Sequence, residues 1–247
     1  MNMNKIFEVG GCVRDEILGV HTNDIDFTFV LGNTNQTVEQ GWNQMVKHLE
    51  DQGFKIFLKN FDCFTVRAMF PKGHQHEGLV ADFVMARKEV GVIEGTRKPI
   101  LELGTLEDDL LRRDFTLNAL AKDLDGTIID LFEGRKHLKE NILITPLDPE
   151  KTFMDDPLRM IRALRFSITR GFEIHESLWK EMFKPELLDK LQEVVSQERI
   201  QGELTKMLKH DTVKTLRFLQ EIDNIEPRLL EIMFEGAMWL MPTNKLK

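Results

Sequence analysis

The chain has 247 residues, of which 42% are hydrophobic and 30% are charged. This composition allows a sizeable buried core and excludes a disordered or fibrous protein. The formal net charge of −8 argues against a general polyanion binder, and no apolar run approaches the roughly 18 residues of a membrane span. Two cysteines cannot form a disulfide framework, and the first residues do not form a secretory leader. We therefore expect a reducing, cytoplasmic setting.

The first half of the chain alternates between predicted strands and helices. Residues 5–9 predict a short strand that runs into two glycines, and residues 12–18 predict one or two helical turns. Alternation of apolar and polar residues, or short apolar runs, predicts strands over 24–31, 54–58, 64–70 and 78–86. One helix is expected over 37–52, where apolar residues recur at helical spacing. This order predicts a mixed sheet with few helices.

The pattern becomes helical in the second half. Thr105 and Asp108 resemble a capping box at the start of a helix predicted over 105–121. Residues 123–131 predict a hairpin around an Asp-Gly turn. From about residue 150 helices dominate, and one of them ends at Gly171. We expect two domains, a mixed α/β head over 1–145 and a helical arm over 146–247.

Two aspartates give the first chemical signal. Asp24 and Asp26 are two residues apart on a predicted strand, so their carboxylates project from the same face. Like charges this close repel unless a cation lies between them, and Mg²⁺ prefers oxygen ligands. A solvated strand end is the alternative for an isolated pair of this kind. Asp82 is the best candidate for a third carboxylate, because it interrupts an otherwise apolar strand, and Asp62 is its competitor.

A glycine-rich turn precedes the aspartates. Gly10 and Gly11 follow a strand and lead into a helix, which lets backbone N–H groups approach an anion closely. Arg14 offers a bidentate contact to phosphate. Alone the turn is an ordinary strand–helix connection. Together with the aspartates about ten residues later, it suggests metal-assisted nucleotidyl transfer.

Two arginine-containing stretches follow. In the first, Arg113 and Asp114 suit a nucleotide, with the guanidinium on phosphate and the carboxylate on ribose, and Asn118 lies one helical turn further along. In the second, Asp156, Arg159 and Arg162 are spaced by three residues and share one helix face, where they can read a base edge. Ordinary surface ion pairs are the alternative interpretation of both stretches.

Five segments now form a familiar set: GGCVRD with DID, RRDFTLNAL, DLDGTIIDLFEG, DDPLRMIRALRF and ERIQGEL. Over residues 5–205 the chain resembles the class II tRNA nucleotidyltransferases, the CCA-adding enzymes, whose relatives are the bacterial poly(A) polymerases. The resemblance implies an α+β fold, with a polymerase-beta-like nucleotidyltransferase head and an all-helical neck and body. It also implies addition of C, C and A to tRNA 3′ ends from CTP and ATP.

The resemblance implies roles for individual residues. Asp24 and Asp26 match the Mg²⁺-binding pair and Asp82 the third catalytic carboxylate, and residues 123–134 match a flexible element. The remaining matches are Gly11 and Arg14 to the triphosphate turn, Arg113 and Asp114 to phosphate and ribose contacts, Asp156 and Arg159 to base recognition, Arg162 and Arg165 to the arginines that follow, and Glu198 and Arg199 to a motif that supports the neck helices.

The chain departs from the family pattern in two ways. Asp155-Asp156 stands where Glu-Asp is usual, and family members continue for more than a hundred further helical residues. We expect tRNA positioning to be weaker or to involve a second subunit, which leaves a homo-oligomer open. Two alternatives remain for the function, a poly(A) polymerase or partial C- or A-adding enzyme, and a silent RNA-binding module. The intact charged residues argue against the silent module.

Overall fold

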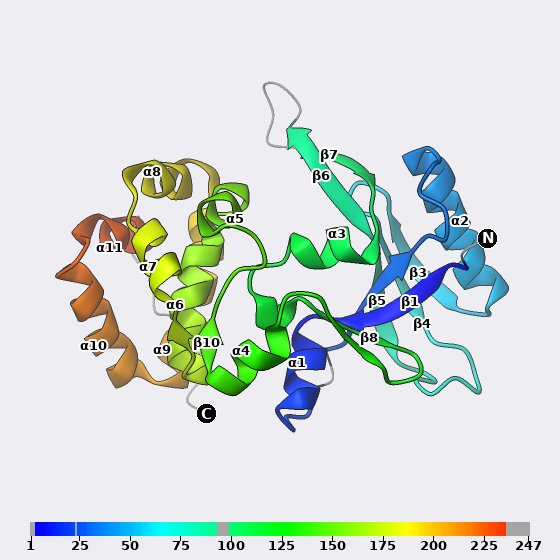
Figure 1. Cartoon of the computed structure of the whole chain (residues 1–247), viewed down its shortest axis with the longest axis horizontal. Coiled ribbons are helices and arrows are strands. Elements are labelled where there is room, and N and C mark those ends of the chain that lie inside the picture. Colours follow the sequence, from blue (N-terminus) through cyan, green and yellow to red (C-terminus); the bar gives the residue numbers. More distant parts are fainter. Residues whose placement is uncertain (1–2, 23, 93–98, 236–247) are drawn as a thin grey trace, which may run out of the picture. The chain divides into compact units, whose positions relative to one another are not determined.

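A computed structural model describes residues 3–22, 24–92 and 99–235. The chain divides into two compact units, Met1–Leu138 and Lys139–Lys247 (Figure 1). The first unit contains the mixed sheet and the second is built mainly of helices. This α+β class, with a sheet-based head and a helical part, is the one predicted from the sequence. The domain roles assigned to 1–145 and 146–247 stay predictions.

A seven-stranded sheet forms the first unit, with the strand order β3-β4-β5-β2-β1-β8-β9. Only β2 and β5 are parallel neighbours, and the other pairs in this sheet are antiparallel. The strands of the sheet are β1 (Lys5–Val9), β2 (Asp26–Val30), β3 (Lys55–Asn60), β4 (Thr65–Met69), β5 (Val80–Met85), β8 (Leu120–Asp123) and β9 (Ile128–Asp130). All the strands and the hairpin predicted in this region are confirmed within a few residues.

The alternation of side chains along β2 separates the two faces of the sheet. Phe27 and Phe29 pack into the larger core, which includes residues of α2 (Val38–Asp51). That helix begins at Thr37, whose side chain forms a capping box with Gln40. Asp26 and Thr28 point to the opposite face, because successive side chains of a strand alternate. Thr28 there donates a hydrogen bond to Asp109 of α3 (Leu106–Leu111).

The helix predicted over 105–121 is wrong in its second half. The capping box of Thr105 and Asp108 is present, but α3 ends at Leu111, and a single 3-10 turn, η1 (Thr116–Asn118), precedes β8. Phe115 has extended backbone, and the Asp114 side chain accepts its N–H. Such local side-chain bonds compete with a helix, and pairing of β8 with β1 outweighs helical propensity.

Three shorter elements complete the first unit. The helix α1 (Gly11–Ile17) follows β1, and α4 (Gly134–Glu140) ends the unit. The hairpin of β6 (Arg87–Val92) and β7 (Pro99–Leu103) was not predicted, and the residues between these strands lie outside the described part. Its sequence lacks the regular alternation that identified the other strands.

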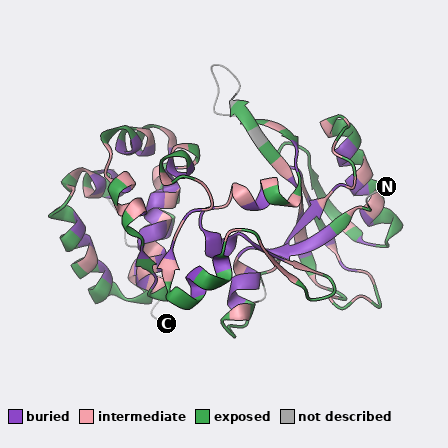
Figure 2. Cartoon of the chain, viewed as in Figure 1, coloured by how far each residue is buried: buried purple, intermediate pink, exposed green. Residues whose placement is uncertain are grey.

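The second unit places the predicted arginine helix at its centre. In α6 (Leu158–Arg170) the apolar residues are buried, as Figure 2 shows along one side of this helix. Gly171 ends it with a left-handed φ of 75°, as predicted. The other helices are α5 (Pro149–Asp155), α7 (Glu176–Met182), α8 (Pro185–Val194), α9 (Gln197–His210), α10 (Thr212–Asp223) and α11 (Pro227–Phe234).

Details of this unit differ from the sequence expectation. Residues 176–194, within the region where helices were expected to dominate, form two helices, α7 and α8, because Pro185 starts a new helix. A two-residue parallel ladder joins β10 (Ile142–Leu143) and β11 (Glu173–Ile174). None of the helices in the described part of the chain is long and apolar enough to cross a membrane.

Candidate active site

The sheet brings two of the three predicted catalytic carboxylates, those of Asp26 and Asp82, onto one face. Asp26 opens β2, and its Cα lies opposite that of Asp82 on the parallel strand β5. Asp24 precedes β2 by two residues and is exposed. Partners in a ladder project to the same face, so the strand pairing itself gathers these acids. The sequence predicted that Asp24 and Asp26 share one strand, but β2 begins only at Asp26, and the parallel register places Asp82 beside Asp26.

The charges of this group act on one another. The pKa of Asp26 is raised above its usual value, first by partial desolvation and then by Asp24, while Asp82 adds to the increase. The guanidinium of Arg113 opposes the shift. Asp26 nevertheless stays accessible to solvent. An accessible carboxylate among other acids is stabilised by a bound cation, so Asp24 and Asp26 fit as oxygen ligands of a divalent metal ion.

Asp82 has a different partner. Arg67, on the neighbouring strand β4, donates two hydrogen bonds of 2.8 Å to the two carboxylate oxygens of Asp82. Within the described residues, no group of three or more His, Cys, Asp or Glu side chains is arranged to hold a metal ion. The structure therefore presents a pair of candidate ligands, Asp24 and Asp26, with Asp82 engaged beside them.

Arg113 is held in place by a fully buried acid. Asp109 has no exposed surface, and it accepts hydrogen bonds from Thr28 at 2.8 Å, from Arg112 and from Arg113 at 3.0 Å. Burial alone would raise the pKa of Asp109, but Arg112 and Arg113 outweigh burial and lower it to about 2. The Nε–H of Arg113 is buried and has no hydrogen-bond partner among the described residues. Arg113 thus keeps one buried donor without a partner in the described part of the protein, while 18% of its side chain is exposed.

Sequence reasoning missed Asp109. The signal was present, since Asp109 precedes Arg112 by three residues and Arg113 by four, which are ion-pair spacings on a helix. Nothing in the sequence indicated that Asp109 would be the buried member of LEDDLL. Its burial comes from contact with β2, which is a tertiary feature.

The glycine turn lies directly beside Arg113. Gly10 has φ 82° and ψ −134°, a conformation that residues with a side chain rarely adopt. A Cβ on Gly10 would lie 2.6 Å from Nη1 of Arg113. Gly11 begins α1, which has seven residues. The turn therefore needs a glycine at position 10 both for its backbone and for the space that Arg113 occupies, while the phosphate role of Gly10 and Gly11 stays a prediction.

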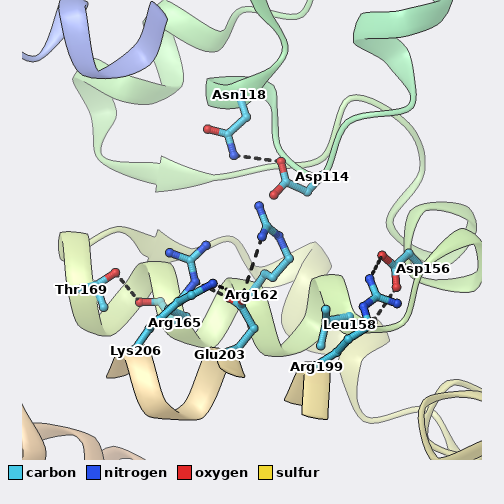
Figure 3. Close-up of polar contacts among 10 residues, drawn as sticks. All are labelled: Asp114, Asn118, Asp156, Leu158, Arg162, Arg165, Thr169, Arg199, Glu203 and Lys206. Carbon is cyan, nitrogen blue, oxygen red and sulfur yellow. Dashed lines mark hydrogen bonds and ion pairs between the residues drawn. The ribbon is translucent and has the colours of Figure 1, made fainter. Parts of the chain in front are cut away.

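Arg14, Asn118 and Asp114 form a buried chain of hydrogen bonds. Arg14 donates to Asp15 at 2.9 Å and to the side-chain oxygen of Asn118 at 2.6 Å. The amide of Asn118 in turn donates to Asp114 at 2.9 Å, as Figure 3 shows. All four side chains are buried. The structure thus places Arg14 as a support for the Asn118–Asp114 segment, and its predicted contact with a triphosphate is untested.

In the second unit, Asp156 connects two helices. It stands between α5 and α6, and one of its oxygens accepts the N–H of Leu158 at the start of α6. The other oxygen accepts a hydrogen bond of 3.0 Å from Arg199 of α9 (Figure 3). Arg159 donates to the backbone carbonyl of Thr152 at 3.1 Å. Asp156 and Arg159 are therefore both oriented by contacts with neighbouring segments.

One buried glutamate gathers the other arginines of α6. Glu203 of α9 is 4% exposed, and Arg165 donates to it through Nε. Arg162 lies 3.9 Å from the same carboxylate and Lys206 at 2.7 Å, and Figure 3 shows the two arginines converging on it. Burial would raise the pKa of Glu203, but these cations lower it below its usual value.

Sequence reasoning identified Arg199 as a supporting residue and missed Glu203. Glu203 interrupts the apolar face of α9, where Ile200, Leu204 and Met207 are buried. An acid on such a face needs a cationic partner, and this was the available signal. The choice of Arg165 and Arg162 as partners depends on how α6 and α9 pack.

These features define a nucleotide-handling class of protein: paired carboxylates on a mixed sheet after a glycine turn, an ordered arginine beside them, and a helical unit with its own ordered Asp and Arg. Comparisons with known proteins agree. Residues 6–144, more than half of the chain, match the family described as "Poly A polymerase head domain". The chain belongs to that family.

Curated relatives have related names. A mitochondrial CCA tRNA nucleotidyltransferase of Candida glabrata is 31% identical over 212 residues, which cover 81% of this chain and 38% of that protein. A CCA-adding enzyme of Lactobacillus helveticus is 37% identical over 207 residues, covering 81% of this chain and 45% of that protein. The chain thus spans less than half the length of these relatives.

Solved structures show the same architecture. The CCA-adding enzyme of Bacillus stearothermophilus in complex with CTP superposes with a TM-score of 0.68 and 27% identity, over 88% of this chain and 48% of that chain. The Thermotoga maritima CCA-adding enzyme complexed with tRNA_CCA gives a TM-score of 0.68 and 26% identity, over 96% and 50%. The resemblance inferred from five sequence segments is confirmed.

Proposed function

We propose that this chain carries a template-independent RNA nucleotidyltransferase activity that adds C, C and A to tRNA 3′ ends from CTP and ATP. The observation that carries the proposal is the group of mutually repelling carboxylates led by Asp24 and Asp26, beside an arginine with a spare buried donor. A cation and a polyanion together satisfy such a group, and a metal-bound nucleoside triphosphate supplies both.

Asp24 and Asp26 are the residues that would hold Mg²⁺ in the head. A divalent ion bound there supplies charge stabilisation for the attacking 3′-hydroxyl and for the pyrophosphate that leaves. Asp82, Gly10, Gly11 and the remaining head residues would complete the site around the triphosphate.

Arg113 is the residue of this chain best placed to orient the triphosphate. Asp109 fixes its guanidinium through Nη2, and the exposed 18% of the side chain is the part that a phosphate oxygen can reach. An arginine ordered before the substrate arrives loses little freedom on binding, which favours catalysis by positioning. Asp114 and Asn118, ordered by Arg14, would hold the ribose side of the same nucleotide.

In the helical unit, Asp156 and Arg159 would read the base. Together an aspartate and an arginine offer acceptors and donors that suit the edges of cytosine and adenine. Arg162 and Arg165, whose positions Glu203 fixes, would add cationic support for the substrates. Residues 123–134 run from the last residue of β8 through β9 to the first residue of α4, and we propose this segment as the element that moves between C and A addition.

The family description favours a second candidate, a poly(A) polymerase. Both reactions use the same chemistry and differ in the nucleotide chosen and in when addition stops. A partial enzyme that adds only C or only A is the third form of this activity. The cysteines suit a reducing compartment in each case, since Cys12 and Cys63 are both free, and we propose a cytoplasmic location.

The test uses tRNAs that end before CCA, after C and after CC. Each is incubated with the protein and Mg²⁺, with single labelled nucleotides and with CTP plus ATP, and products are sized at single-nucleotide resolution. Addition of C, C and A followed by a stop supports CCA addition. A long A ladder identifies a poly(A) polymerase, a single step identifies a partial enzyme, and no extension contradicts the proposal.

A further inference from the structure

Three neighbouring strands place a cation and two acids in one row on the sheet. Arg67 on β4 lies opposite Asp82 on β5, and Asp82 lies opposite Asp26 on β2. Ladder partners project to the same face of a sheet. The guanidinium of Arg67 and the carboxylates of Asp82 and Asp26 therefore all lie on one side of this sheet. Arg67 has no role in the motifs discussed above.

The guanidinium of Arg67 takes both oxygens of Asp82. Nε donates to Oδ1 and Nη2 to Oδ2, each at 2.8 Å. This two-bond arrangement occupies one lone pair on each oxygen and fixes the orientation of the carboxylate. Asp82 therefore cannot turn toward an ion beside Asp26, or chelate it through both oxygens, without giving up at least one bond to Arg67.

The ion pair is open to exchange. The Arg67 side chain is 53% exposed and that of Asp82 33%, so water and ions reach both groups. Ion pairs with this exposure contribute little to stability. A phosphodiester group of RNA offers a guanidinium the same two-oxygen geometry as a carboxylate and the same single negative charge. A phosphate at the edge of the site can therefore replace Asp82 on Arg67.

We propose that Arg67 is a positioning residue that withholds Asp82 from the divalent ion until a phosphate of the RNA primer takes the place of Asp82 on its guanidinium. The proposal rests on the proposed function, because it concerns the metal and RNA of that site. It predicts that primer and metal bind cooperatively, and that Arg67 and Asp82 carry the cooperativity. The site is then completed only when the RNA to be extended is present.

The first experiment measures Mn²⁺ binding without RNA or nucleotide, from the amount of free ion seen by electron paramagnetic resonance. Arg67→Gln is expected to bind Mn²⁺ about fivefold more tightly than the unmodified chain, the size of a weak coupling. The same substitution in an Asp82→Asn background is expected to give a much smaller change, because no carboxylate remains to be released.

Lys59→Gln is the matched control. Lys59 lies on the adjacent strand β3, pairs with Glu50, and its ladder partner is Val66 rather than Arg67, so it projects from the opposite face. The Lys59→Gln substitution removes one positive charge from the same sheet and is expected to leave Mn²⁺ affinity unchanged. Equal tightening by Arg67→Gln with and without Asp82 would show a general charge effect and overturn the proposal, and so would no tightening.

The second experiment adds a short single-stranded RNA with a free 3′-hydroxyl and no nucleotide. RNA is expected to tighten Mn²⁺ binding in the unmodified chain and in Lys59→Gln, and to have a smaller effect in Arg67→Gln. Equal coupling in all three proteins, or none in the unmodified chain, would overturn the exchange. A third variant, Asp26→Asn, separates failure of this proposal from failure of the proposed function. If Asp26 is not part of a metal site, this substitution leaves Mn²⁺ affinity unchanged.

Discussion

Two charged groups in this chain are built on opposite principles. In the head, Asp24 and Asp82 lie near Asp26, and partial burial together with these two acids raises the pKa of Asp26. In the helical unit, Glu203 is one acid among Arg162, Arg165 and Lys206, which lower its pKa. Nearby opposite charges satisfy the helical group within the protein, whereas the head group still favours a cation from outside. The first arrangement suits a ligand site, and the second suits a support that orients arginines.

The largest expected effect comes from the head. Asp26→Asn removes a candidate metal ligand and should lower turnover at least about 10³-fold, as loss of a charge-stabilising group does. It also relieves repulsion with Asp24 and Asp82, so the melting temperature measured without metal should not fall. Primer extension and thermal unfolding check the two parts.

Asp62→Asn is the control for this substitution, because Asp62 was the sequence-based competitor and lies in an exposed turn. Turnover of that variant should stay close to the unmodified value. Near-normal activity of Asp26→Asn would show that Asp26 is not a metal ligand. The acids of the head would then not differ in role from the Glu203 cluster of the helical unit.

The sequence predicted the head group better than the helical group. Asp24 and Asp26 are two residues apart in the chain, and the strand predicted over 24–31 was expected to place them on one face, whereas β2 begins only at Asp26. Asp82 could be predicted because an acid within an apolar strand is costly to bury unless it has a partner. The partner itself, Arg67, comes from the register of β4 against β5, which no local pattern contains.

Residues that act through tertiary contacts escaped prediction. Glu203 and Asp109 each have a buried carboxylate, and their burial depends on how α9 packs on α6 and α3 on β2. The helix predicted over 105–121 failed for the same reason, since pairing with β1 makes residues 120–123 a strand. The periodicity of a sequence indicates the structure of one helix or strand at a time. The burial of these acids and the pairing of residues 120–123 depend instead on contacts between elements.

The next effect tests the helical group. Glu203→Gln leaves Arg165 and Arg162 without their shared counter-charge, and breaking a buried ion pair in this way costs about 3 kcal/mol of unfolding free energy. Urea unfolding of the two proteins measures the loss. Glu221→Gln on α10 removes the same charge from an exposed position and should change stability by less than about 0.5 kcal/mol.

A loss of similar size in both variants would mean that the Glu203 cluster does no more than a surface acid. Selectivity among the four nucleotides should also weaken in Glu203→Gln, because the arginines of α6 lose their fixed orientation.

The head also contains an acid whose charge is balanced within the protein, Asp109 beside Arg112 and Arg113. Its titration makes the stability of the fold depend on pH. The pKa of Asp109 falls from 3.8 to about 2 on folding, despite burial, because of Arg112 and Arg113. A carboxyl with a lowered pKa stabilises the fold above its unfolded pKa and loses this contribution as the pH falls through the folded value. We expect about 2 kcal/mol to be lost between pH 4 and pH 2.

Unfolding free energies of the unmodified chain and Asp109→Asn across this range check the window, since the variant should lack this part of the slope. Glu107→Gln, exposed on the same helix, should keep it. If the unfolding free energies of the unmodified chain and of Asp109→Asn change with pH in the same way, the loss of stability does not come from the titration of Asp109.

The smallest expected stability effect separates backbone strain from ligand positioning in the head. Gly10 and Gly73 have φ of 82° and 81°, so alanine at either position strains the backbone, by about 1–3 kcal/mol at Gly10, whose ψ of −134° lies outside the left-handed helical region. Only at Gly10 does the new Cβ meet another group, Nη1 of Arg113 at 2.6 Å, whereas nothing lies within 4 Å at Gly73. Because Nη1 is the end of a flexible side chain, Arg113 can move away at little cost in stability. Both variants should therefore melt at lower temperatures than the unmodified chain, while only Gly10→Ala raises the KM for nucleoside triphosphate. Equal KM values would mean that Arg113 keeps its function after displacement, and that its order in the structure does not serve substrate binding.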